Sequence, residues 1–281
     1  MTSEERADNA SHSPTTDPGA AAALLDALPC DSARLPEAVS ALVMDRQFAA
    51  GLRVAVAPDS AGDPECRTIR RILGRLRALD PAPLDVPRPP ERRLIGVCRD
   101  HALLACAALR HHGVPARLRA GLASYFRAGH HEDHVVCEYH AGDRWRLADS
   151  ELTGPVRDHF GIAFDPADVP RDAFLVGGDA WQRLRRGALD PARCGVSFIG
   201  IAGAWFVAGS VVRDVAALDK REMLLWDYWG LVRDFGRGTV VPAHAAERLD
   251  AVAARPGRSP RGRRCATPAT TATTCACRPR S

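Results

Sequence analysis

The sequence lacks the patterns that identify most zinc proteins and most secreted proteins. It contains no CxxC pair and no HExxH motif, and its first twenty residues include no long apolar run. The nine cysteines form an odd count without regular spacing, so they do not predict a disulfide framework. These absences argue against a structural zinc site and against a secretory signal. They predict a cytoplasmic protein with no metal and no cofactor.

A group of histidines is the one feature of the sequence that suggests a metal site. Imidazole and thiolate are side chains that zinc prefers as ligands. The residues concerned are His130, His131 and His134, together with Cys98 or Cys137. Their spacing matches no zinc motif, so a metal site is the weaker interpretation of this group.

Acidic residues are missing from the end of the chain, which biases the overall charge. The whole sequence carries a formal net charge of +4. Residues 255–281 contain seven arginines and no acid, so the rest of the chain carries −3. A mildly acidic body offers no basic surface for a nucleic acid. The low-complexity tail, residues 251–281, is predicted to be disordered.

Charge is also missing from residues 194–212, CGVSFIGIAGAWFVAGSVV, which are about enough to cross a bilayer. Four glycines and two serines in this stretch suit close packing in a protein interior as well as in a membrane. No second span and no basic flank on one side accompany it. A buried core segment is the preferred interpretation, and a membrane-associated helix is the alternative.

The remaining sequence predicts one α+β domain. Residues 1–19 are polar and aperiodic, which predicts a disordered segment. Residues 20–250 are expected to form a single domain. Within it, residues 35–52 are predicted to form one helix. The domain has three predicted parts: a helical pad over 20–90, a core over 91–151, and a mixed or helical C-terminal part over 152–250.

A nearly all-apolar helix opens the core. Residues 100–109 are mostly Ala, Leu and Cys, so this helix should have no solvent-exposed face, and Gly113 should end it. Its first turn lies near Cys98. Unpaired N–H groups and the positive end of the helix dipole favour a thiolate there. Cys98 is therefore a candidate nucleophile, although buried cysteines are more often inert, as Cys106 is expected to be.

A predicted hairpin supplies partners for that thiolate. Residues 116–122 alternate as a strand does, residues 129–133 are predicted as a polar loop, and residues 134–140 and 144–149 form two strands joined by a tight turn. His134 opens the first of these strands and Asp149 closes the second, so antiparallel pairing brings them together. A base and a group that orients it are what a cysteine nucleophile needs.

These residues together resemble the transglutaminase-like superfamily. The matching features are Cys98 at a helix start, Gly113-Val114-Pro115-Ala116-Arg117 after the helix, His134 in HVVCE and Asp149 in WRLAD. The flanks resemble those of bacterial proteins that carry this domain. The resemblance implies a papain-like core, with a central buried helix on an antiparallel sheet and helical flanks on both sides. It also implies acyl transfer through a thioester on Cys98, with His134 as base and then acid and Asp149 orienting it.

The sequence departs from the family at two points. A second oxyanion donor is commonly a Trp, Tyr or Gln before the cysteine, but residues 1–97 contain no Trp or Tyr and only Gln47. No carboxylate cluster suggests calcium. The expected substrate is a peptide, a protein or a small acyl compound, with water or an amine as acceptor. A non-catalytic binding module and an amide-forming synthase of small-molecule biosynthesis remain alternatives.

Overall fold

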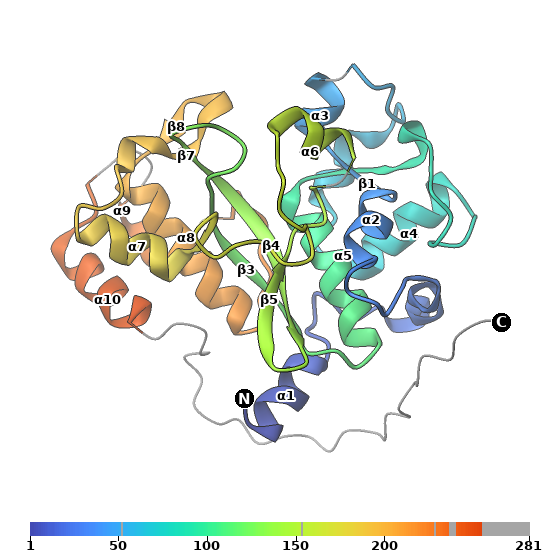
Figure 1. Cartoon of the computed structure of the whole chain (residues 1–281), viewed down its shortest axis with the longest axis horizontal. Helices are drawn as coiled ribbons and strands as arrows, with labels where there is room; N and C mark the ends of the chain where they lie inside the picture. Colours follow the sequence, from blue (N-terminus) through green and yellow to red (C-terminus); the bar gives the residue numbers. More distant parts are fainter. Residues whose placement is uncertain (52, 153, 228, 236–239, 255–281) are drawn as a thin grey trace.

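A sheet with helices on both faces forms the centre of the molecule (Figure 1). The computed structural model describes residues 1–281 except 52, 153, 228, 236–239 and 255–281. One face of the sheet carries α5 (Cys98–His111) and the helices around it, and the other carries α7 (Gly177–Arg185) and α8 (Ala204–Leu218). The α+β prediction and the central helix on a sheet are confirmed. The predicted tail, 251–281, lies outside the described residues beyond 254.

The sheet has the strand order β6-β3-β4-β7-β8, and β5 pairs with β4. The pairs are antiparallel except that of β4 with β7, which is parallel. The predicted hairpin is confirmed as β4 with β5, in the register Cys137 opposite Ala148. The strands of this sheet are β3 (Ala116–Ala123), β4 (His131–Ala141), β5 (Arg144–Ala148), β6 (Phe174–Val176), β7 (Cys194–Val196) and β8 (Ile201–Ala202).

The part of the chain before α5 packs against that helix. Its apolar residues and those of α5 form one buried cluster with the adjoining sheet face. The helices of this part are α1 (Ser3–Ala10), α2 (Leu35–Ser40), α3 (Arg46–Gly51) and α4 (Ile69–Leu79), with 3-10 turns η1 (Gly19–Ala27), η2 (Ser60–Glu65) and η3 (Pro90–Arg92). Strands β1 (Val43–Asp45) and β2 (Leu94–Gly96) form a small parallel pair.

Most of the chain after β5 covers the other sheet face, but α6 (Pro155–Phe160) lies beside α3, with the ring centroids of Phe160 and Phe48 5.7 Å apart (Figure 1). The side chains of α7, α8 and α10 form a second buried cluster with Leu122 of β3. The helices here are α6, α7, α8, α9 (Leu231–Phe235) and α10 (Ala243–Ala253), with 3-10 turns η4 (Pro191–Arg193) and η5 (Ser197–Ile199).

Helix α5 has the boundaries and the burial that its sequence predicts. Every residue from Cys98 to Arg110 is buried. The helix ends through Gly113, which has a φ of 74°, a conformation that favours glycine. Arg110 does more than complement the helix dipole. Its buried guanidinium donates to Glu222 Oε1 at 3.0 Å and to Thr16 Oγ1 at 2.9 Å.

The predicted disorder of residues 1–19 is wrong. Thr2 caps α1 by accepting a hydrogen bond from the Glu5 backbone N–H. Ser13 is buried and donates from its hydroxyl to Glu222 Oε2 at 2.8 Å. The polar composition that suggested disorder therefore reflects local capping and buried hydrogen bonds, which compensate for the few apolar residues in this segment.

Two predicted boundaries are corrected by strand pairing. The expected helix over 35–52 is interrupted, because residues 43–45 pair with residues 94–96 as a parallel ladder. The expected loop over 129–133 is shorter, because β4 already begins at His131 and pairs with β7 there. Both strands depend on partners distant in sequence, which local periodicity does not reveal.

The stretch 194–212 is divided among β7, η5, β8 and the first part of α8. Val207, Ala208 and Val211 are buried, as the core interpretation predicts, whereas Phe198 and Ile199 are more than half exposed. In the part of the chain that the structure describes, no helix is both long and apolar enough to cross a bilayer.

Strand β3 is buried on both faces, although its sequence alternates between apolar residues and arginines. The arginines are accommodated by buried acids. Arg119 donates from Nε and Nη2 to the two carboxylate oxygens of Asp214, both at 2.8 Å, and from Nη1 to Glu138 Oε2 at 2.8 Å. Arg117 donates to the same Glu138 oxygen at 2.7 Å. The alternation in β3 therefore marks a layer of buried ion pairs and not a solvent-exposed face of the sheet.

Glu138 should make stability depend on pH in the acid range. Burial alone would raise the pKa of Glu138, but nearby guanidinium groups outweigh it and hold this pKa well below its usual value. A carboxyl group with a depressed folded-state pKa stabilises the protein above its unfolded pKa, about 4.3, and this contribution is lost as the pH falls further. Glu138→Gln should therefore lower the free energy of unfolding at pH 7 and flatten its decline below about pH 4.5.

Urea unfolding at a series of pH values between 7 and 3 measures both effects. The matched control is Glu37→Gln, because Glu37 is exposed on α2. Equal pH dependence in Glu138→Gln and the wild type would contradict the assigned role of Glu138.

Candidate active site

Cys98 is placed by a short strand that leads directly into α5. Residues 94–96 pair with β1, so that Gly96 lies opposite Asp45. The Asp100 carboxylate then accepts a hydrogen bond from the Val97 backbone N–H at 3.0 Å, which closes the first turn of the helix. A Cβ at Gly96 would lie 2.8 Å from Asp100 Oδ2, so only glycine fits there without displacing this group. Cys98 thus stands at the helix N-terminus, as the sequence predicts.

His134 and Asp149 meet at one end of the hairpin. His134 pairs with Gly121 in the β3–β4 register, and Asp149 follows the last residue of β5. His134 Nε2 lies 2.7 Å from Asp149 Oδ2. The same carboxylate oxygen accepts a hydrogen bond of 2.7 Å from the Tyr125 hydroxyl. The Tyr125 hydroxyl therefore helps to hold the Asp149 carboxylate in position beside His134.

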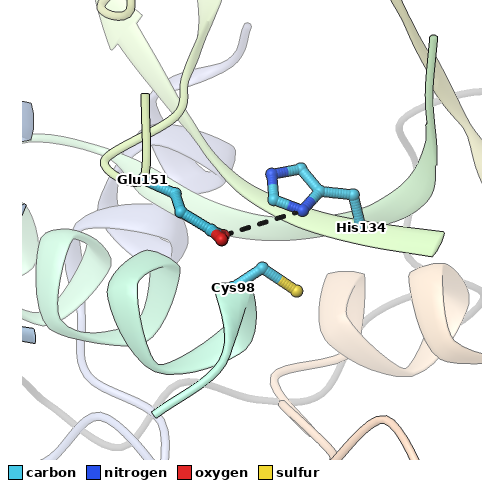
Figure 2. A group of neighbouring side chains, drawn as sticks. All are labelled: Cys98, His134 and Glu151. Atoms are coloured by element: carbon cyan, nitrogen blue, oxygen red, sulfur yellow. Dashed lines mark ion pairs between the residues drawn. The ribbon is translucent and has the colours of Figure 1, made fainter. Parts of the chain in front are cut away.

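The structure brings Cys98, His134 and a third residue, Glu151, together (Figure 2). One ligand-type atom of each lies within 4.8 Å of the other two. His134 Nδ1, the ring nitrogen not bonded to Asp149, lies 3.9 Å from Glu151 Oε2. No pattern in the sequence indicated Glu151. Its position two residues after Asp149 is a signal only once the turn after β5 is known to bring it back toward α5.

Of the residues considered as zinc ligands in the sequence, His134 and Cys98 belong to this cluster. His130 instead faces Glu132, with 3.3 Å between Nδ1 and Oε1. Gln47, the upstream candidate for an oxyanion donor, has an exposed side chain at the start of α3. Its backbone N–H donates to Asp45 Oδ1 at 2.6 Å.

The charge around Cys98 opposes the expected effect of the helix N-terminus. Burial raises the pKa of the Cys98 thiol well above its usual value, and nearby carboxyl groups raise it further. These carboxyl groups belong to Glu151, Asp133 and Asp45. A backbone hydrogen bond with Val135 acts in the opposite direction but is smaller. The expectation of a lowered thiol pKa in the free protein is therefore wrong, because desolvation and acidic neighbours outweigh the helix terminus.

The pKa values of the two carboxyl groups after β5, Asp149 and Glu151, are shifted in opposite directions. Burial alone would raise the pKa of Asp149, but the charge of His134 and hydrogen bonds from His134 and Tyr125 lower it overall. Burial raises the pKa of Glu151 well above its usual value, and Asp45 and Asp149 add to this effect. Asp149 thus favours its ionised form beside His134, whereas Glu151 favours its protonated form.

Aromatic rings enclose His134. Its ring centroid lies 5.0 Å from that of Phe126, 6.0 Å from that of Tyr125 and 6.3 Å from that of Phe174. Apolar walls exclude water, which strengthens the electrostatic interaction between His134 and Asp149. They also restrict the imidazole to the orientation in which Nε2 faces Asp149.

Cys98 is only 6% exposed. A hollow on the neighbouring surface is lined by Trp205, Phe206, Trp229 and Arg213 among others. Arg213 connects this hollow to the site, since its guanidinium donates to Asp133 Oδ1 at 2.5 Å, next to His134 in the chain.

Comparison with known families agrees with this geometry. The model of the transglutaminase-like superfamily matches residues 70–150. This range contains α4, α5 and the strands β2 to β5, and with it Cys98, His134 and Asp149. The searches of curated proteins and of solved structures found no match. Residues 70–150, which include α5, β3, β4 and β5, are therefore similar to the transglutaminase-like superfamily.

Proposed function

We propose that the protein is a cysteine enzyme that transfers acyl groups through a thioester on Cys98. The observation that carries the proposal is the hydrogen bond of 2.7 Å between His134 Nε2 and Asp149 Oδ2, with Cys98 beside the same imidazole. This bond fixes the proton on Nε2 and leaves Nδ1 free to accept one. Nδ1 is the ring nitrogen on the side of Cys98 and Glu151.

The reaction proceeds in two halves. His134 Nδ1 takes the thiol proton of Cys98, Sγ attacks the carbonyl carbon of an amide or ester, and the proton passes to the leaving amine or alcohol. Water or an amine then attacks the thioester and gives a proton to His134, and the C–S bond breaks as His134 returns that proton to Cys98 Sγ. Asp149 stabilises the imidazolium formed in each half.

The acidic neighbours of Cys98 affect the stage of the reaction at which its thiol loses a proton. Because burial and then Glu151, Asp133 and Asp45 raise the pKa of the Cys98 thiol, the resting site favours the thiol over the thiolate. Proton transfer therefore accompanies attack on the substrate. A thiol that is deprotonated only in the reacting complex is protected from oxidation and from unselective alkylation between turnovers.

The proposal is tested with p-nitrophenyl acetate as a general acyl donor. Release of p-nitrophenolate should accompany a mass gain of one acetyl group on the peptide that contains Cys98. Cys98→Ala should abolish this adduct, and the matched variant Cys106→Ala should retain it, because Cys106 is a buried thiol on the same helix. Adding an amine such as cadaverine then shows whether the acetyl group passes to water or to the amine.

A non-catalytic binding module is the second candidate. The observations that favour it are the burial of Cys98 and the raised pKa of its thiol. An acetylation that is equal in the wild type and in Cys98→Ala would support this candidate and would contradict the proposed enzyme. An amide product formed with cadaverine would favour an amide-forming synthase over a hydrolase.

We also propose a cytoplasmic location, with a peptide, a protein or a small acyl compound as the substrate. Five of the six cysteines in the described residues are free thiols, whereas Cys30 is disulfide-bonded, and this excess of free thiols supports a reducing compartment.

A further inference from the structure

Glu151 is the residue of the site that the acyl transfer chemistry leaves without a role. Its Oε2 atom is buried and has no hydrogen-bond partner, and the residue is 7% exposed. A buried carboxyl oxygen without a partner is costly, because it has lost its hydrogen bonds to water. Figure 2 shows that this oxygen faces His134 and Cys98.

The three side chains that meet at this oxygen form a set of metal ligands. They come from the start of α5, from β4 and from the segment after β5, and their atoms lie within 4.8 Å of one another. The thiolate of Cys98 excludes calcium and magnesium as the preferred ions, since both favour oxygen ligands. Thiolate, imidazole and carboxylate together are the ligand types of zinc.

The distance between two of the three ligand atoms can be compared with that expected around a tetrahedral zinc ion. Two ligand atoms about 2.05 Å from such an ion lie about 3.4 Å apart. His134 Nδ1 and Glu151 Oε2 are 3.9 Å apart, so this pair would have to close by roughly half an ångström to bind one ion, with Cys98 Sγ within 4.8 Å of both atoms. Three protein ligands leave a fourth position for water.

The outer shell of such a site is already present. A histidine that binds a metal usually donates its other ring N–H to a carboxylate, which fixes the ring and its tautomer. His134 does this through Nε2 and Asp149, at 2.7 Å, and Tyr125 holds the same carboxylate oxygen. His134 therefore presents Nδ1 to the position between Cys98 and Glu151.

We propose that Cys98, His134 and Glu151 bind one Zn²⁺ ion. The ion takes Sγ of the nucleophile and Nδ1 of the base, so zinc binding and thioester formation exclude each other. Zinc is therefore a reversible inhibitor of acyl transfer. Glu151 supplies the third zinc ligand, beside the nucleophile and the base. The inhibition rests on the proposed function, whereas the binding site does not.

Isothermal titration of the metal-free, reduced, full-length protein with ZnCl₂ measures binding directly. One ion per chain is expected. Cys98→Ala and Glu151→Gln should each weaken binding by more than the roughly 10- to 100-fold typical of losing an outer-shell partner. The matched control Cys106→Ala should bind as the wild type does. Titration with Co²⁺ should give a sulfur-to-cobalt charge-transfer band that Cys98→Ala lacks.

Two results would overturn the metal site. One is the absence of binding at one ion per chain in the wild type, and the other is binding that persists in both Cys98→Ala and Glu151→Gln. Glu151→Gln nearly preserves the shape of the side chain, so a thermal unfolding curve like that of the wild type separates loss of a ligand from loss of the fold. Zinc binding without any acetylation of Cys98 would support the site and contradict only the proposed enzyme.

Discussion

Asp149→Asn should lower the rate of acetyl transfer from p-nitrophenyl acetate by about 10⁴-fold, the loss typical of replacing the carboxylate of such a triad. An asparagine amide can donate to His134 Nε2, which would place the imidazole proton on Nδ1. Nδ1 could then no longer accept the proton of Cys98. The measurement is the initial rate of p-nitrophenolate release at neutral pH, corrected for hydrolysis in buffer.

Tyr125→Phe is the matched control for this substitution. It removes one hydrogen bond to Asp149 Oδ2 but keeps the carboxylate and its bond to His134. A hydrogen bond to a charged group contributes about 1.5–3 kcal/mol, so the rate should fall by roughly 10- to 150-fold at most. If Asp149→Asn were as active as Tyr125→Phe, Asp149 would not set the tautomer of His134.

Arg119→Met should give the largest loss of stability among single substitutions in the sheet. The Arg119 side chain is 3% exposed, and it pairs with both Asp214 and Glu138. Removing one partner of a buried ion pair leaves an uncompensated charge, at a cost of about 3–5 kcal/mol. Here two carboxylates lose a partner, so the free energy of unfolding should fall by at least about that amount.

Denaturant unfolding compares this variant with Arg144→Met. Arg144 pairs with Asp168 at the surface, where its side chain is 52% exposed. Breaking an exposed pair should lower the free energy of unfolding by less than about 1 kcal/mol. Equal losses in the two variants would show that the charged layer on β3 contributes no more than a surface pair.

The elements that carry the candidate site follow from the sequence because their signals are local. The apolar run of α5, the glycine after it and the tight turn between β4 and β5 each depend on neighbours a few residues away. Strand ends are fixed once the hairpin is known, so the meeting of His134 with Asp149 could be predicted. The match of residues 70–150 to one family covers this same region.

The features that the sequence did not reveal depend on distant partners. Strand β1 exists because it pairs with residues far along the chain, and the N-terminal segment is ordered by bonds to Glu222 and Lys220. The high pKa of the Cys98 thiol comes first from burial and then from acids on three other segments. Helix position favours a thiolate only when its surroundings are neutral or positive, and no local pattern shows that here.

The buried contacts of Glu222 have a consequence for synthesis on the ribosome. This single acid binds Arg110 at the end of α5 and Ser13 near the N-terminus. At about 5–20 residues per second, it emerges roughly 5–25 s after Arg110. During this interval the nascent core carries an uncompensated cation and an undocked N-terminus. The unit formed by α5 and the adjoining sheet therefore completes its folding only after Glu222 has been translated, and until then it is exposed to binding by a chaperone.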